Sequence, residues 1–305
     1  MSIIEQATLR LEQLKHAGID VPTAPDAARV SGAIARSANR ATLVRDLPAA
    51  PRRALGSGRA QSREVQLDLS RLLAEGYITP DDPRTGLAEE LRAIKRPIID
   101  HAMRTRQNSK ERGNLVIVTS AMPGDGKTFC AINLALSIAT EVDHSVLLVD
   151  ADVVRPSILS RLGVEAGLGL LDVLTNPSLD LSDVLMRTNI PKLSLLAAGS
   201  PTPKSTELLA SSAMEGLLSE LAARYSDRII IFDAPPLLAT SESRVLASRM
   251  GQVLMVVQAN ATQRDAVIKA FADIQSCETV WCVLNGGEPE HGATGYGYYS
   301  QFPSA

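Results

Sequence analysis

The sequence predicts an α/β fold, a mostly parallel sheet with helices on both faces, and three observations support this. Beyond Gly113, short apolar runs alternate with longer stretches of helical apolar spacing. The runs are apolar at nearly every position, as buried parallel strands are. A glycine-rich loop follows directly on the first run, where a strand would pass into a helix. The expected strands are residues 115–120, 145–150, 193–199, 228–235, 252–259 and 280–285.

Composition excludes several classes of protein. The 305 residues are 45% hydrophobic and 21% charged, which is typical of a soluble globular protein. A formal net charge of -3 gives no overall attraction to nucleic acid, so no nucleic-acid partner is expected. The three cysteines form no C-x-x-C pair and predict neither a disulfide framework nor a zinc site. We find no signal peptide and no run of about 18 apolar residues, so a cytoplasmic protein without a transmembrane segment is expected.

Three segments precede the α/β part of the chain. Residues 1–20 carry apolar side chains at helical spacing and predict an amphipathic helix. Residues 21–63 are rich in Ala, Pro, Ser, Gly and Arg and predict a flexible linker, which either stays solvated or binds an anionic surface. Residues 64–112 have helical spacing on both sides of the stretch GYITPDDP. They predict two helices, which form the helical N-terminal part of a domain whose α/β part is residues 113–290.

The glycine-rich loop carries the first chemistry. The stretch from Ala121 to Thr128, AMPGDGKT, matches the phosphate-binding P-loop pattern except that alanine replaces the first glycine. A strand before it and a helix after it would point the N–H groups of the loop at a polyphosphate. Lys127 is expected to reach the β- and γ-phosphate oxygens, and Thr128 to hold Mg²⁺. The sequence therefore predicts a P-loop NTPase-like fold.

Aspartates end two other predicted strands. Asp150 and Asp152 close the stretch VLLVDAD, and carboxylates two residues apart in an extended chain point to the same side. Asp233 ends the run IIIFD, which resembles a Walker B strand, and is expected to support Mg²⁺. An aspartate at a strand end also forms turns or caps helices, and Asp152 before Arg155 is open to that interpretation. With the P-loop, these residues predict phosphoryl chemistry with ATP and Mg²⁺ as cofactors.

These motifs together resemble a known family. The stretches SAMPGDGKT, VLLVDADVVRPS, IIIFDAPP and WCVLN, with a tyrosine cluster near the end, are similar to the bacterial protein-tyrosine kinases of exopolysaccharide synthesis. The stretch GYITPDDPRTGLAEELRAIKRPII further resembles the cytoplasmic tyrosine autokinases that accompany exosortase-linked exopolysaccharide loci. The resemblance covers residues 65–305, is weak over residues 1–20 and does not extend to the Arg-rich linker.

The resemblance implies roles for the matched positions. Asp150, assisted by Asp152, would orient or deprotonate the tyrosine hydroxyl while Lys127 holds phosphate, so these are the candidate catalytic residues. The candidate ligands of Mg²⁺ are Thr128, Asp150 and Asp233. Asn285 falls where related ATPases contact adenine. The candidate nucleotide-binding residues are Pro123, Gly124, Asp125, Gly126, Lys127, Thr128, Phe129 and Asn285.

Two positions depart from the family pattern. The D-x-D-x-R motif of the family has Val154 where arginine is expected, with Arg155 one place later. The E-x-x-R-x-x-R helix motif of the family, which builds a ring-shaped oligomer, reads Glu89, Arg92 and Lys95 here. Lysine keeps the charge but lacks the bidentate fork of arginine, and Arg96 could take its place with a shift in register. The alternative interpretation of this stretch is an exposed helix face with charge pairs three and four residues apart.

Residues 291–305 predict a flexible tail that carries Tyr296, Tyr298 and Tyr299. Taken alone, its glycines predict a frayed end. The resemblance implies instead that these tyrosines are autophosphorylation sites, modified in trans within a homo-oligomer. It also implies two other partners. The cytoplasmic tail of a membrane polysaccharide chain-length determinant would recruit the chain to the inner face of the membrane, and a tyrosine phosphatase would act as antagonist.

Two other functions stay open on the sequence. A partitioning or cell-division ATPase of the same fold would act as an ATP-driven dimer switch. Such proteins carry the loop K-G-G-x-G-K, whereas Met122, Pro123 and Gly124 stand at its first three positions here. A catalytically idle ATP-binding regulator would keep the nucleotide site without transferring a phosphoryl group. The intact Lys127 and the strand-end aspartates argue against that function.

Overall fold

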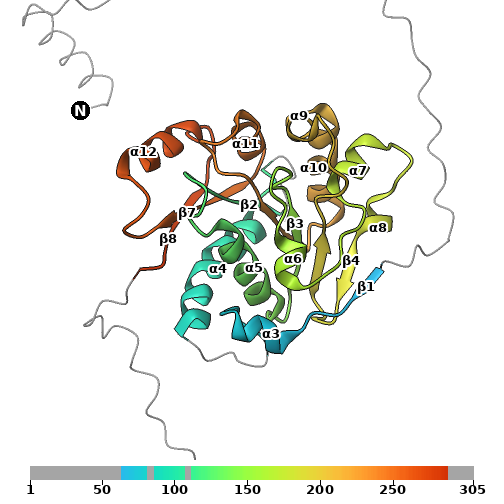
Figure 1. Ribbon diagram of the computed structural model, residues 1–305, viewed down its shortest axis with the longest axis horizontal. Helices are drawn as coiled ribbons and strands as arrows, with labels where there is room; N and C mark the ends of the chain where they lie inside the picture. The colour runs from blue at the N-terminus through green and yellow to red at the C-terminus, as the bar shows by residue number, and fades with distance from the viewer. Residues whose placement is uncertain (1–62, 81–85, 107–110, 288–305) are drawn as a thin grey trace, which may run out of the picture. The chain divides into compact units, whose positions relative to one another are not determined.

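The computed structural model describes residues 63–80, 86–106 and 111–287, which form an α/β unit with a central sheet (Figure 1). Eight strands within these ranges make one sheet in the order β1-β4-β5-β3-β6-β2-β7-β8. Neighbouring strands are parallel, except for the antiparallel pair of β4 and β5. The strands are β1 (Arg63–Val65), β2 (Leu115–Ser120), β3 (Ser145–Asp150), β4 (Met186–Thr188), β5 (Leu193–Leu196), β6 (Arg228–Asp233), β7 (Gln252–Gln258) and β8 (Val280–Asn285).

Helices cover both faces of the sheet, and the side chains of each strand alternate between two cores. Val116 and Val118 of β2 belong to the core that includes α3 to α6, whereas Leu115 and Ile117 belong to the core that includes α7 to α12. The helices are α3 (Leu69–Ala74), α4 (Gly86–Thr105), α5 (Lys127–Ala139), α6 (Ile158–Leu162), α7 (Leu170–Thr175), α8 (Leu181–Val184), α9 (Ser205–Leu209), α10 (Ser212–Arg224), α11 (Ser241–Ala247) and α12 (Arg264–Asp273).

The predicted fold class and all six predicted strands are confirmed. Three of these strands end earlier than expected, at Leu196, Asp233 and Gln258. β6 stops before two prolines, which supply no N–H group for a ladder. β1 and β4 were not predicted, because three residues are too few to show a strand period.

The segment before the P-loop belongs to the same α/β unit, and the sequence prediction of two helices there did not include a strand. Both helices exist, but β1 adds a strand to the edge of the sheet. The amide of Asn189 exchanges two hydrogen bonds with the backbone of Leu67, at 2.9 and 3.1 Å. The N–H of Ile78 donates to the side-chain oxygen of Asn133 on α5 at 2.9 Å. Residues 63–79 are therefore attached at several points to the helix that follows the P-loop and to the sheet.

Several predictions concern residues outside the described ranges. They are the amphipathic helix of residues 1–20, nearly all of the linker of residues 21–63, and the tail with Tyr296, Tyr298 and Tyr299. The division of the chain at these boundaries stays a prediction. Among the helices that the structure describes, none combines the length and the apolar character needed to cross a membrane.

The link between Ile78 and Asn133 predicts a measurable stability loss in Asn133→Ala. The substitution leaves the N–H of Ile78 unsatisfied in a buried position, which costs about 1–3 kcal/mol in the free energy of unfolding. Urea unfolding measures this loss. The matched control, Lys269→Ala on the exposed side of α12, should change the free energy by less than about 0.5 kcal/mol. Equal effects of the two substitutions would contradict the assigned role of Asn133.

Candidate active site

The P-loop joins β2 to α5, and two of its glycines have left-handed backbone angles. Gly124 has a φ of +95° and Gly126 a φ of +93°, which other residues rarely adopt. A Cβ on Gly126 would also lie 2.0 Å from Nδ2 of Asn285, so a side chain has no room there. Gly126 is the N-cap of α5, whose first N–H groups have no partner within the helix. This turn therefore presents backbone donors to an anion such as a polyphosphate.

The side chains of two predicted nucleotide-binding residues, Asp125 and Asn285, form hydrogen bonds that fix the shape of the loop. The Asp125 carboxylate accepts hydrogen bonds from the N–H of Met122 at 3.0 Å and from the hydroxyl of Thr262 at 2.7 Å. The Asn285 amide donates to the carbonyl of Asp125 and to the side-chain oxygen of Gln258, both at 3.0 Å. Because both polar groups are used inside the protein, a contact from Asp125 to phosphate would come from its backbone N–H.

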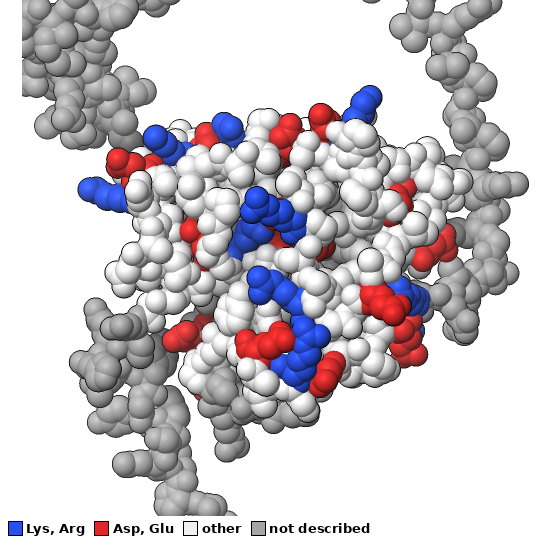
Figure 2. Space-filling model, in the orientation of Figure 1, with Lys and Arg blue, Asp and Glu red and all other residues white. Residues whose placement is uncertain are grey.

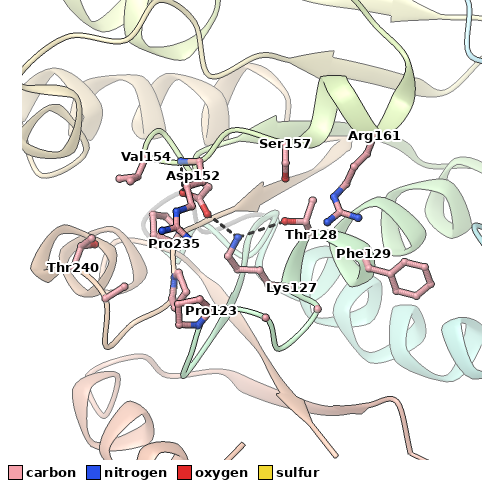
Figure 3. Close-up of a pocket in the computed structure, with 15 residues that line it drawn as sticks. Pro123, Lys127, Thr128, Phe129, Asp152, Val154, Ser157, Arg161, Pro235 and Thr240 are labelled. Atoms are coloured by element: carbon pink, nitrogen blue, oxygen red, sulfur yellow. Dashed lines mark hydrogen bonds and ion pairs between the residues drawn. The ribbon is translucent and has the colours of Figure 1, made fainter. Parts of the chain in front are cut away.

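A cavity of about 460 Å³ lies in front of the P-loop (Figure 3). Four parts of the chain line it: the loop with the start of α5, the segment after β3, α6, and the segment after β6. The lining residues are Pro123, Gly124, Gly126, Lys127, Thr128, Phe129, Asp152, Val154, Arg155, Ser157, Arg161, Pro235, Pro236, Ala239 and Thr240. The sequence did not single out the residues of α6 or those after Asp233, because only the order of the strands brings them to this cavity.

Lys127 lies between two carboxylates. Its Nζ is 2.7 Å from Oδ2 of Asp152, the contact drawn in Figure 3, and 3.7 Å from Oδ1 of Asp233. The hydroxyl of Thr128 donates to Oδ2 of Asp233 at 2.7 Å. Asp150 stands opposite Asp233 in the register of β3 and β6. The structure thus brings the predicted catalytic and metal-binding residues to one edge of the sheet, where three parallel strands end side by side.

Asp150 belongs to this group but is turned toward α6. Its side chain is only 1% exposed, and its Oδ2 accepts hydrogen bonds from the N–H groups of Ser157 at 2.9 Å and Ile158 at 3.0 Å. Asp150 therefore caps the start of α6, whereas Asp152 forms a turn, in which its Oδ1 accepts a hydrogen bond from the N–H of Arg155 at 3.1 Å. Asp152 is the carboxylate that pairs with Lys127 in the cavity.

Burial changes the ionisation of two of these carboxyl groups. Burial, together with the neighbouring charges of Asp233 and Asp152, raises the pKa of Asp150 to about 7 against two backbone hydrogen bonds that lower it. Burial also raises the pKa of Asp233 to about 6, against the opposing charge of Lys127. In each group Oδ1 is buried without a hydrogen-bond partner among the described residues. The site therefore holds carboxylate oxygens that are ready to take a proton or a cation.

These oxygens allow a test of whether Mg²⁺ fits the site. Mg²⁺ is usually held by one or two protein oxygens, with phosphates and waters completing its coordination. Thr128 and Asp233 supply a hydroxyl and a carboxylate at the first turn of α5, beside the space expected for phosphate. Within the described ranges, no cluster of three or more His, Cys, Asp or Glu could hold a metal. The residues therefore fit Mg²⁺ that binds together with a nucleotide.

Two arginines line the cavity, although Val154 stands where the D-x-D-x-R motif has its arginine. Val154 lines the cavity with 54% of its surface exposed, and Arg155 lines the same cavity one residue later. Arg161 of α6, which the sequence analysis did not identify, also lines it. Figure 2 shows basic side chains running through the middle of the viewed face of the molecule. The chain thus keeps guanidinium groups at the cavity despite losing the family arginine.

The three predicted oligomerisation residues do not share one exposed face. Glu89 and Arg92 form an ion pair at 2.6 Å on α4, as the alternative interpretation of this stretch expects. Lys95 is only 2% exposed, and its Nζ lies 2.8 Å from Glu141 and 2.7 Å from the carbonyl of Ser137. Its ammonium therefore attaches α4 to the end of α5 within the chain, which removes it from the surface that a neighbouring molecule would contact.

The raised pKa of Asp150 predicts that the protein without nucleotide or metal loses stability as the pH rises. An unfolded aspartate has a pKa near 3.9, so between about pH 4 and pH 7 the folded state binds more protons than the unfolded state. The stability that protonation of Asp150 contributes is fully present below about pH 4 and is lost as the pH rises through about 7. The free energy of unfolding, measured with urea in EDTA, should decrease between about pH 5 and about pH 8. This decrease should be smaller for Asp150→Asn than for the unchanged protein. Equal decreases would contradict the assignment.

Comparison with known proteins identifies the family to which the chain belongs. No protein-family model matches the chain. It is 31% identical over 229 residues to the tyrosine-protein kinase YwqD of Bacillus subtilis, which covers 74% of the chain and 92% of that protein. It is 33% identical over 244 residues to a putative tyrosine-protein kinase, EpsB, of Ralstonia nicotianae, which covers 77% of the chain but only 31% of the longer relative.

Solved structures agree with these relatives. The kinase domain of the Escherichia coli tyrosine kinase ETK matches with a TM-score of 0.62 and 26% identity, over 76% of this chain and 92% of that domain. The kinase domain of VpsO matches with a TM-score of 0.50 and 30% identity, over 66% of this chain and 99% of that domain. The chain is thus similar to such kinases in sequence and in fold, and it belongs to the bacterial tyrosine-protein kinase family.

Proposed function

We propose that the chain is an ATP-dependent protein-tyrosine autokinase that phosphorylates Tyr296, Tyr298 and Tyr299 of its own tail and so regulates exopolysaccharide synthesis or export. The observation that carries this proposal is the placement of Lys127 between Asp152 and Asp233 at a P-loop, in a chain of the tyrosine-kinase family. ATP is the phosphoryl donor. Mg²⁺, when bound at Thr128 and Asp233, would neutralise charge on the phosphates.

Nucleotide binding would change the partner of Lys127. The ammonium is paired with Asp152, but a polyphosphate on the P-loop N–H groups competes for it with several negative oxygens. Once Lys127 moves to the β- and γ-phosphates, the Asp152 carboxylate is released at the mouth of the cavity. Binding of ATP would therefore place an ionised carboxylate beside the phosphoryl group that is to be transferred.

The transfer itself needs an acceptor for one proton. A bond forms between the tyrosine oxygen and the γ-phosphorus, the bond from that phosphorus to the bridging oxygen breaks, and ADP leaves. The proposed final acceptor of the phenol proton is Asp150, a stronger base than an ordinary carboxylate because burial raises its pKa to about 7. Since Asp150 is turned toward α6 and Asp152 lines the cavity, Asp152 would pass the proton to it. A phenol has a pKa near 10, so the proton moves late, as charge leaves the oxygen. Asp152 assists by orienting the hydroxyl.

A tail that is modified in trans needs a neighbouring molecule, so we propose a homo-oligomer. The ring predicted from the family motif would rest on Glu89 and Arg92, since Lys95 is buried in its own chain. We further propose recruitment to the inner face of the membrane by the cytoplasmic tail of a polysaccharide chain-length determinant, with a tyrosine phosphatase as antagonist. Phosphates on the tail would add about -1.5 to -2 charge each and weaken contacts with the neighbour.

The first test is a map of phosphorylated residues after incubation with ATP and Mg²⁺. We expect phosphotyrosine at Tyr296, Tyr298 or Tyr299, and a loss of about 100-fold or more in Lys127→Met, because the ammonium stabilises charge on the transferring phosphate. The matched control is Lys269→Met, an exposed residue of α12 that does not line the cavity. ATP hydrolysis without phosphotyrosine would instead indicate an ATPase switch and end the kinase proposal.

A mixing experiment tests transfer between molecules. One variant, Lys127→Met, has an intact tail but no catalytic ammonium, and a second replaces Tyr296, Tyr298 and Tyr299 with phenylalanine but keeps the site. Neither should become phosphorylated on its tail alone. When the two are mixed, the tail of Lys127→Met should be phosphorylated, at a rate that rises with protein concentration. If the mixture stays unmodified while the unchanged protein reacts at a concentration-independent rate, transfer occurs within one molecule.

A further inference from the structure

Arg161 stands across the cavity from the P-loop. It lies on α6, whose residues Ile158 and Leu162 are buried at 1% and 3% exposure and fix the helix against the core. In Figure 3 its guanidinium extends from α6 toward Thr128 and Phe129. Its charge also lowers the pKa of Asp233, against the larger effect of burial, so it acts on the carboxylate at the phosphate end of the site.

Tyr77 holds this arginine from a distant part of the chain. The Nη1 group of Arg161 donates to the Tyr77 hydroxyl at 3.3 Å, across 84 positions of sequence. The Tyr77 side chain is 3% exposed, and its ring packs on the ring of Phe129 with centroids 5.2 Å apart. The next residue, Ile78, is bonded to Asn133 on α5. Tyr77 is therefore a fixed anchor beside the first turn of α5.

One hydrogen bond leaves most of the guanidinium available. Arginine has five N–H donors in a planar fork that matches the oxygens of a phosphate. Within the described ranges, the bond to Tyr77 is the hydrogen bond that Arg161 forms, and it forms no ion pair there. A buried hydroxyl that orients one edge of the fork would leave the other donors directed toward the cavity.

From these contacts we propose that Arg161 binds the terminal phosphate of the nucleotide, and that Tyr77, in the segment before the P-loop, is the residue that positions it. The inference rests on the proposed function only in taking ATP as the ligand. As the bond to the γ-phosphorus breaks, negative charge grows on the oxygens of both phosphates, and the fixed guanidinium stabilises it without having to reorient. The segment of residues 63–79 thereby acts on the active site through Tyr77.

Binding of Mg-ATP and Mg-ADP to the full chain, followed with fluorescent analogues, tests the assignment apart from kinase activity. In Arg161→Gln the Kd for Mg-ATP should rise about tenfold or more, whereas the Kd for Mg-ADP should rise less than about threefold. Arg161→Lys should recover part of the affinity for Mg-ATP, because it keeps the charge and loses the fork. Arg224→Gln, which removes an exposed arginine of α10, is the matched control and should leave both constants unchanged.

A double-mutant cycle tests the role of Tyr77. Tyr77→Phe keeps the packing on Phe129 and removes the hydroxyl. As a single substitution it should raise the Kd for Mg-ATP about two- to fivefold, whereas added to Arg161→Gln it should cause no further rise. If Tyr77 had a merely structural role, Tyr77→Phe would weaken the binding of Mg-ATP and Mg-ADP equally. The same weakening would also appear in Arg161→Gln. Tyr225→Phe, whose ring lies under Arg224 and Arg228, is the control for loss of a hydroxyl.

The outcomes separate this inference from the proposed function. The assignment of Arg161 is wrong, even when phosphotyrosine is formed, in either of two cases. In one, the Kd of Arg161→Gln for Mg-ATP stays within about twofold of that of the unchanged protein, and in the other, its affinities for Mg-ATP and Mg-ADP fall equally. Additive effects of Tyr77→Phe and Arg161→Gln would overturn the positioning role. If the unchanged protein binds Mg-ATP but forms no phosphotyrosine, the kinase proposal fails while the binding comparison still decides the role of Arg161. If it binds no nucleotide, both are overturned.

Discussion

The hydrogen bond from Thr128 to Asp233 is the contact on which the rest of the site depends. It joins the first turn of α5 to the end of β6, across 105 positions of sequence, and both groups are buried. β6 lies between β2 and β3 in the sheet, so this bond fixes the P-loop over the two strands that carry the aspartates. Lys127, next to Thr128 on α5, is thereby placed within reach of Asp152 and Asp233.

The sequence predicted the residues that act through their position along a strand or loop. Lys127, Thr128, Asp152 and Asp233 follow apolar runs that end at the same edge of a parallel sheet, and this pattern is readable without the structure. The roles of Asp150 and Asp152 were less predictable. Whether a carboxylate at a strand end caps a helix or faces a cavity depends on the path of the next few residues, and here α6 begins where Asp150 can cap it.

What the sequence did not reveal depends on contacts between distant segments. Arg161 gives no local signal, because an arginine on a short helix is usually solvated, and only its bond to Tyr77 and its place in the cavity distinguish it. Lys95 shows the reverse case. The family motif implied that it lies in an interface with Glu89 and Arg92, yet its long side chain reaches the end of α5 and is buried. Side-chain direction on a helix is settled by the packing of the helix, which spacing alone does not determine.

The electrostatics of the site explain why cations must accompany the nucleotide. β3 and β6 end together and place Asp150, Asp152 and Asp233 close to one another. Burial raises the pKa of Asp150 and of Asp233, and the neighbouring carboxylates raise both to a smaller extent. A bare polyphosphate would add several negative charges to this group. Lys127 and the donors at the start of α5 offset part of the repulsion. Oδ1 of Asp233 accepts no hydrogen bond from the described residues and leaves a place for a divalent cation. An acidic site of this kind therefore favours a nucleotide that arrives with its metal over a nucleotide alone.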